Sequence, residues 1–141
     1  MKMDNNNSQY LAQDIFTYEV DFTALAAGAT QSSSIQIENS SDFLWQKATF
    51  FADIAAAAQT QSGQVLPLAT VLLTDSGSAR QLMNSAVPIP NMFGVGYSPF
   101  ILTVPKKFLA RSSITVAVTN FSAATTYNIR LSFIGVKLFL R

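Results

Sequence analysis

A two-residue alternation of apolar and polar side chains constrains this chain more than any other feature. Near the end of the chain, apolar residues occupy every second position from Ile114 to Val118 and again from Tyr127 to Phe133. Successive side chains of a β-strand point to opposite faces, so this period indicates strands with one buried face. Because the turn-forming run 120–125 separates the two segments, we expect them to form one long hairpin.

The alternation changes parity at Gly135, after which the apolar positions are even-numbered from Val136 to Leu140. One inserted residue moves all later side chains of a strand to the other face, so the pattern predicts a β-bulge at Gly135. This bend leaves open whether residues 136–140 pair within their own chain or with a neighbouring chain.

Further alternating or β-prone segments are separated by residues that favour turns. They cover residues 15–22, 35–37, 43–54, 66–74 and 99–104. Seven or eight strands and no long helix predict an all-β protein, an antiparallel β-sandwich of the jelly-roll kind. An immunoglobulin-like sandwich is the close competitor.

The connections carry their own expectations. In the turn DSGSAR (75–80), we expect Gly77 to supply conformational freedom. Residues 105–113 are expected to be a turn that approaches the next strand, and residues 55–63 a loop with a possible helical turn.

Two segments, residues 33–52 and 112–135, share an order of Ser pair, alternating strand, Asn-centred turn and aromatic strand. We expect two hairpins in comparable positions, as in a sandwich of facing sheets.

Residues 1–12 are polar and include Asn5, Asn6 and Asn7. Burial cannot offset the entropy of ordering such a segment, so we expect a flexible N-terminal arm before a single β-sandwich domain at 13–141. The start has no apolar signal region and no run reaches the ~18 apolar residues of a spanning helix, so we expect a soluble, unprocessed chain without membrane contact.

Charged residues make up 12% of the chain, about half the share in a typical soluble domain. Either part of the surface faces another protein, or the surface is rich in uncharged polar side chains. The formal net charge is +1 and the basic residues are scattered, so we expect no direct nucleic-acid binding.

Cysteine and histidine are absent. Their absence removes disulfides, thiolate nucleophiles, the usual imidazole base and most zinc sites, so we expect no enzyme, no metal and no cofactor.

The sequence offers two candidates for chemistry or binding. Glu19 and Asp21 lie two apart on a strand, as a glycosidase pair could, although solvated carboxylates are the preferred interpretation. Trp45 could stack on sugars, although core packing is preferred for so large an aromatic residue.

Residues 81–99 form a long connection with three of the five prolines and two close glycines. Loops of this length in compact domains are usually functional or belong to an interface.

Over about residues 14–140 the chain resembles the jelly-roll head-decoration, or cement, proteins of tailed bacteriophages. The resemblance rests on DSGSAR (75–80), the SPF before a strand (98–100), SSITVAVTN (112–120) and FIGVKLF (133–139). It implies a virion structural protein on the capsid exterior, made in the host cytoplasm. It also implies a homo-oligomer, a dimer or trimer, that binds the major capsid protein and stiffens the head.

The expected capsid contacts lie in the arm, the DSGSAR turn and the long connection. They are Asn5, Asn6, Asn7, Asp75, Ser76, Gly77, Ser78, Arg80, Pro88, Pro90, Phe93 and Tyr97. Two alternatives stay open: a neck, tail or baseplate protein, and a carbohydrate-binding host-adhesion module that stacks sugars on Trp45 or Tyr97.

Overall fold

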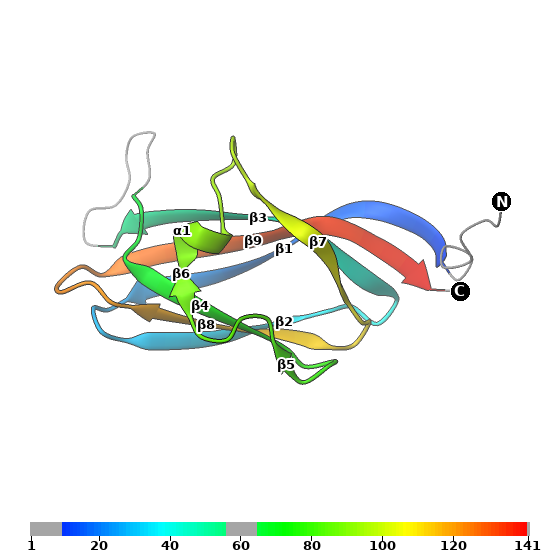
Figure 1. Ribbon diagram of the computed structural model, residues 1–141, viewed down its shortest axis with the longest axis horizontal. Helices are drawn as coiled ribbons and strands as arrows, with labels where there is room; N and C mark the ends of the chain where they lie inside the picture. The colour runs from blue at the N-terminus through cyan, green and yellow to red at the C-terminus, as the bar shows by residue number, and fades with distance from the viewer. Residues whose placement is uncertain (1–9, 56–64, 141) are drawn as a thin grey trace.

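The alternating segments form two antiparallel β-sheets that pack face to face (Figure 1). The computed structural model describes residues 10–55 and 65–140. The first sheet contains, in spatial order, β1 (Tyr10–Leu25), β9 (Tyr127–Leu140), β3 (Ser41–Ile54) and β7 (Phe100–Phe108). The second contains β2 (Thr30–Gln36), β8 (Ser113–Asn120), β4 (Ala69–Asp75) and β5 (Arg80–Gln81), with β6 (Val87–Pro88) also paired to β4.

The long strands alternate between the two sheets along the chain. β1, β3, β7 and β9 belong to the first sheet, and β2, β4 and β8 to the second. This alternation makes the domain a jelly roll, and it confirms the predicted all-β antiparallel sandwich. It excludes the immunoglobulin-like competitor, which joins several consecutive strands within one sheet.

The predicted hairpin of residues 114–133 is wrong. β8 pairs with β2 and β4 in the second sheet, whereas β9 pairs with β1 and β3 in the first. The apolar faces of β8 and β9 therefore meet across the core instead of lying side by side. Alternation shows that a strand has one buried face, but not whether its chain neighbour lies beside it or opposite it.

The repeated segments do hold comparable positions, although neither is a hairpin. The segment β2–β3 and the segment β8–β9 each cross from the second sheet to the first. β2 lies antiparallel to β8, and β3 lies antiparallel to β9. The sequence echo thus marks two crossings that pack against each other through both sheets.

Asn120 fixes the crossing from β8 to β9. Its side chain is fully buried and donates hydrogen bonds to the carbonyls of Leu25 (2.9 Å) and Thr125 (2.7 Å). Its carbonyl accepts the N–H of Ser122 at 2.9 Å. One amide side chain therefore satisfies three backbone groups where the chain changes sheets.

The bulge lies in β3 and not at Gly135. β9 pairs with β1 without interruption through Gly135, while in β3 the consecutive partners of Gly135 and Ile134 are Trp45 and Lys47, which leaves Gln46 as the extra residue. The odd positions of β9 stay buried through Lys137, which is 8% exposed, and Leu138 next to it is also buried, at 6%. Gly135 and Lys137 occupy buried positions but are not apolar. The alternation of apolar residues therefore no longer marks the buried face in the sequence.

Two partners stabilise the buried ammonium group of Lys137. Its ammonium lies 2.6 Å from a carboxylate oxygen of Glu38 and 3.7 Å from the centre of the Phe16 ring. A buried cation needs such partners, because desolvation otherwise disfavours its charged form. The strand end 136–140 pairs with β1 and β3 of its own chain, which decides the pairing that the sequence left open.

The ends of two elements differ from expectation. β1 begins at Tyr10, so the last residues of the predicted arm 1–12 belong to a strand, and residues 1–9 lie outside the described residues. Pairing with β9 supplies main-chain hydrogen bonds that side-chain polarity does not reveal. β7 likewise continues to Phe108, because Lys106 to Phe108 pair with β3 across part of the expected turn 105–113. The loop prediction for 55–63 lies almost wholly outside the described residues.

An aromatic cluster fills the core. Trp45 is 1% exposed and its ring lies 4.9 Å from that of Phe133, with Phe93 and Phe108 at 6.4 and 6.1 Å. The Trp45 indole N–H donates to the carbonyl of Lys47 at 2.6 Å. The preferred interpretation of Trp45 as a core residue is confirmed.

The long connection 81–99 closes one side of the sandwich. Its short helix α1 (Ile89–Met92) contacts both β3 and β4, and lies between the two layers in Figure 1. Ile89 and Phe93 are fully buried, so this connection is anchored in the core.

Candidate interaction surfaces

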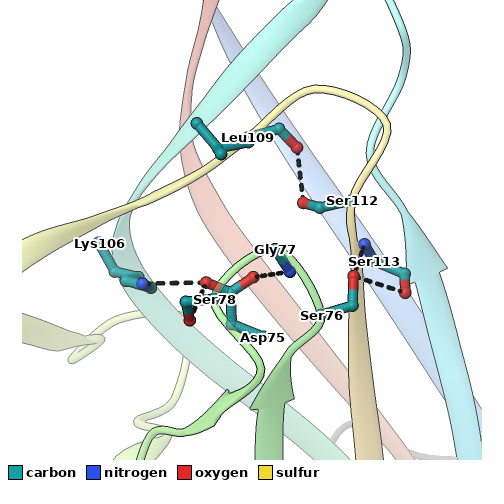
Figure 2. Close-up of polar contacts among 8 residues, drawn as sticks. All are labelled: Asp75, Ser76, Gly77, Ser78, Lys106, Leu109, Ser112 and Ser113. Atoms are coloured by element: carbon teal, nitrogen blue, oxygen red, sulfur yellow. Dashed lines mark hydrogen bonds and ion pairs between the residues drawn. The ribbon is translucent and has the colours of Figure 1, made fainter.

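The DSGSAR turn is a closed hydrogen-bonded unit at one end of β4 (Figure 2). Asp75 is buried at its base and accepts hydrogen bonds from the N–H of Gly77 and the hydroxyl of Ser78, both at 2.9 Å. The ammonium of Lys106, on β7, lies 3.1 Å from the same carboxylate. Asp75 therefore joins the two sheets at this end.

These contacts set the protonation of Asp75. Burial by itself raises the pKa of this carboxyl group, but the hydrogen bonds from Lys106, Ser78 and Gly77 and the Lys106 charge outweigh burial. The pKa of Asp75 is therefore held below its ordinary value, and the group is a carboxylate at neutral pH.

The turn is also tied to the loop between β7 and β8. The Ser76 hydroxyl accepts the N–H of Ser113 at 2.7 Å, and the Ser112 hydroxyl donates to the Leu109 carbonyl at 2.6 Å (Figure 2). The expected role of Gly77 is wrong, because the left-handed residue of this turn is Ala79, with φ of 57°. Gly77 instead allows close packing, since a Cβ there would lie 3.3 Å from Asp75 and Ser112.

We expect Asp75→Asn to lower the free energy of unfolding by about 1–3 kcal/mol at neutral pH, because the buried ion pair is lost. The folded-state pKa is depressed, so this contribution is complete above the ordinary value of 3.8 and declines as the pH falls through the folded pKa. Urea unfolding of both proteins at neutral pH and at about pH 3 measures it.

The two curves should converge in acid. Asp14→Asn is the matched control, because Asp14 is exposed on β1 and its replacement should change stability by less than about 0.5 kcal/mol. A gap between wild type and Asp75→Asn that stays constant across this pH range would contradict the assignment.

The predicted capsid contacts fall into three groups by their exposure. Ser76, Gly77, Ser78, Arg80, Pro88 and Pro90 are exposed, and Tyr97 is 92% exposed. Asp75 and Phe93 are buried, so neither side chain is exposed for direct contact; one holds the turn together and the other packs in the core. Asn5, Asn6 and Asn7 lie outside the described residues.

The structure adds a surface that the sequence analysis did not identify. The outward side chains of β2, β8 and β4 form what we term the uncharged face. Their outward direction follows from alternation with buried residues, among them Ile35, Val116 and Val71. The face consists of Thr30, Ser32, Ser34, Gln36, Thr70, Leu72, Thr74, Ser113, Thr115, Ala117 and Thr119.

Strand register arranges this face in rows. Thr119 lies between Thr30 and Thr70, and Thr115 lies between Ser34 and Thr74. The hydroxyls of Thr30 and Thr119 hydrogen-bond at 2.7 Å. The signal in the sequence was the absence of charge from three strands on their polar parity, but only the pairing shows that these positions form one surface.

The outer face of the first sheet is different, because it carries charged residues from each of its three long strands. Glu19 and Asp21 of β1 lie beside Arg130 of β9, at 3.8 and 4.0 Å from its guanidinium nitrogens. On β3, Asp53 accepts a hydrogen bond from Asn128 at 3.1 Å. Charge is thus segregated between the two outer faces of the sandwich.

These residues line a hollow of about 760 Å³ over β1, β9 and β3. Within it, burial and the neighbouring Asp21 raise the pKa of Glu19, against the opposing effect of Arg130. The part of the chain that the structure describes holds no cluster of three or more residues able to bind a metal ion. Nor does that part contain a helix long and apolar enough to cross a membrane.

Comparisons with known proteins are sparse. No protein-family model matches the chain, and no curated protein matches it. Among solved structures it is similar to the infectious bursal disease virus VP2 subviral particle, at 12% identity and a TM-score of 0.30, over 92% of this chain and 34% of that one. A structure of the Gx strain of the same virus matches at 12% identity and a TM-score of 0.21, over 94% and 43%. The chain therefore spans less than half of either viral chain.

Proposed function

We propose that this chain is a virion structural protein, a decoration or cement protein that docks its uncharged face on the major capsid protein of a tailed bacteriophage. The observation that carries the proposal is the segregation of charge between the outer faces. The face of β2, β8 and β4 has no charged side chain, whereas the opposite face holds Glu19, Asp21, Asp53 and Arg130.

An uncharged hydroxyl-rich face suits permanent contact with another protein. Charges buried in an interface must be desolvated, and their attraction seldom exceeds that cost by much. Ser and Thr hydroxyls can both donate and accept hydrogen bonds, so they adapt to a partner's main chain or side chains. The Ser76 to Ser78 turn and the exposed Arg80 lie where β4 ends and β5 begins, next to the uncharged face.

The resemblance to phage head-decoration proteins supports the same role, with the protein on the capsid exterior after synthesis in the host cytoplasm. Self-association as a dimer or trimer fits it, because several weak contacts on one oligomer raise avidity by about 10²–10⁴ when geometry allows simultaneous binding. The proposed role is mechanical, with no catalytic step, no cofactor, and no nucleic acid or membrane as partner.

The test is co-sedimentation of the purified chain with phage heads stripped of accessory proteins. We expect a fixed small-integer ratio of bound copies to capsid subunits at saturation. Thr115→Lys, at the centre of the uncharged face, should reduce binding at least tenfold, because it adds an unpaired charge to the interface. Thr17→Lys, on the exposed outer side of β1, is the matched control and should bind like wild type.

The outcomes are distinct. Equal binding by wild type and Thr115→Lys, with loss in Thr17→Lys, would place the contact on the first sheet and overturn the docking face. A handful of copies per particle would instead indicate a neck, tail or baseplate position, and no binding to heads would remove the decoration role.

A further inference from the structure

We propose that the hollow on the outer face of the first sheet binds a neutral oligosaccharide. The hollow holds about 760 Å³ and is built on adjoining strands whose outward residues lie in register. One row crosses the sheet as Glu19, Ser132 and Thr49, and the next as Asp21, Arg130 and Phe51. This volume lies within the range of ligand pockets in proteins.

One end of the hollow has polar groups already held in place. Asn128 donates to the carboxylate of Asp53 at 3.1 Å, and its carbonyl accepts the N–H of Ala24 at 2.9 Å. The Asn128 amide is therefore oriented by the main chain at one side and by a carboxylate at the other. Asp53 keeps a second carboxylate oxygen that can accept hydrogen bonds from a ligand hydroxyl.

The middle of the hollow offers a guanidinium between two carboxylates. Arg130 lies 3.8 Å from Glu19 and 4.0 Å from Asp21, and its side chain is 63% exposed. These separations are longer than a direct hydrogen bond, so the donors of Arg130 remain open to a third group, while Glu19 and Asp21 share a side-chain hydrogen bond with each other. Adjacent hydroxyls of a sugar can donate to a carboxylate and accept from a guanidinium, so they satisfy both kinds of group together.

An apolar surface completes the site. Phe51 lines the hollow and is 43% exposed, because it lies on the side of β3 that faces away from the core. The ring can pack against the C–H face of a sugar, the contact expected where one side of a ligand is apolar and its rim is polar. Aromatic residues exposed beside carboxylate and amide groups are therefore well suited to a saccharide.

A loop forms the far wall next to β3. Gly94 pairs with Thr49, donates its N–H to the carbonyl of Ala48 at 3.1 Å and accepts the N–H of Phe50 at 2.8 Å. These bonds hold Gly96 at the hollow, and no atom lies near the position of a Cβ there. Tyr97, the next residue in the chain, is 92% exposed.

The charges of the lining select the class of saccharide. Glu19, Asp21 and Asp53 oppose a single cation, Arg130, so the lining has an excess of negative charge. An anionic sugar such as a sulfated or sialylated glycan is therefore disfavoured. Of the two aromatic residues that the sequence offered for sugar stacking, Trp45 is buried and takes no part, whereas Tyr97 is exposed.

This inference is independent of capsid docking, since the hollow and the uncharged face lie on opposite outer faces of the sandwich. A decoration protein docked through its second sheet would present the hollow outward. Loss of glycan binding and loss of head binding are then separate results.

The test is NMR titration of the full ¹⁵N-labelled chain with maltohexaose, mannohexaose, cellohexaose, chitohexaose and, as the anionic probe, a heparin hexasaccharide. We expect saturable shifts of the Asn128 side-chain amide and the Gly96 amide with at least one neutral probe at millimolar concentration. Phe51→Ala should weaken that binding about tenfold, or 1.4 kcal/mol, and Asp53→Asn should also weaken it. Thr115→Lys, on the uncharged face, is the matched control and should bind like wild type.

Three results would overturn the proposal. They are no shift at these amides with any neutral probe, binding of the heparin probe alone, and unchanged affinity in both Phe51→Ala and Asp53→Asn. If Phe51→Ala does not fold, Phe51→Leu keeps an apolar side chain without a ring and should show the same loss of affinity.

Discussion

Gly135→Ala should lower the free energy of unfolding by more than about 3 kcal/mol, because its Cβ has no space. A Cβ at Gly135 would lie 1.9 Å from the carbonyl oxygen of Leu44 and 2.9 Å from its carbonyl carbon. These are main-chain atoms of the neighbouring strand, so no side-chain rotation relieves the overlap. β3 and β9 must separate at the centre of the first sheet, which breaks main-chain hydrogen bonds as well.

The cause is the bulge in β3. Gln46 is the extra residue opposite Gly135 and Ile134, and the backbone of Leu44 and Trp45 approaches β9 closely beside it. A glycine is required for this approach because it has no side chain, and not for a left-handed conformation.

Urea unfolding measures this effect, with Gly96→Ala as the matched control. Gly96 has no atom within 4 Å of its Cβ position and no positive φ, so its replacement should change stability by less than about 0.5 kcal/mol. Equal stabilities of the two alanine variants would show that the register of β3 against β9 is wrong.

Trp45→Ala should lower the free energy of unfolding by about 3–5 kcal/mol. Its side chain is 1% exposed and packs among the rings of Phe93, Phe108 and Phe133. The variant leaves a cavity in this cluster and removes the donor to the Lys47 carbonyl at 2.6 Å. Both effects act in the folded state, so the unfolding midpoint in urea should fall sharply.

Tyr97→Ala is the control for Trp45, because Tyr97 is 92% exposed and should contribute less than about 0.5 kcal/mol. Comparing Trp45→Ala with Phe51→Ala separates two roles of aromatic residues, core packing and ligand binding. Loss of stability without a specific loss of glycan affinity is expected for Trp45, and the reverse for Phe51. A folded Trp45→Ala protein of wild-type stability would be incompatible with a packed core at this position.

The low charge content is not spread evenly over the protein, because the two outer faces of the sandwich differ in charge. The interpretation of a surface rich in uncharged polar side chains is confirmed for the second sheet, while the first sheet keeps charged ones; contact with another protein stays a prediction. If the uncharged face docks on a capsid, that face is covered in the virion and the charged face remains in water. The distribution, and not the percentage, therefore carries the functional information.

The capsid contacts stay predictions, but the structure shows which of the candidate residues are exposed. Ser76 to Ser78 and Tyr97 are exposed, and for Ser76 to Ser78 this follows from the sequence, because small polar residues of a turn rarely fill a core. Phe93 was misplaced since it lies in a Pro/Gly-rich connection, where the sequence has no period to show a buried side. Its burial depends on the gap between β3 and β4 that α1 fills.

The elements that depend on local pattern could be predicted from the sequence. The two-residue alternation located the long strands, and the lack of long helical patterns specified an all-β sandwich, because one buried face per strand is a property that neighbouring residues report. Asn, Ser and Gly runs located the connections for the same reason.

Which strands lie side by side could not be predicted from local pattern. β8 and β9 alternate in the same way whether they pair in one sheet or face each other across the core, so their separation into two sheets had no local signal. The bulge opposite Gly135, the inward Lys137 and the hollow lined by Asp21, Arg130 and Phe51 all depend on contacts between distant strands. Pairing free energy arises between residues far apart in sequence, and for that reason the surfaces available for binding appeared only when the sheets were assembled.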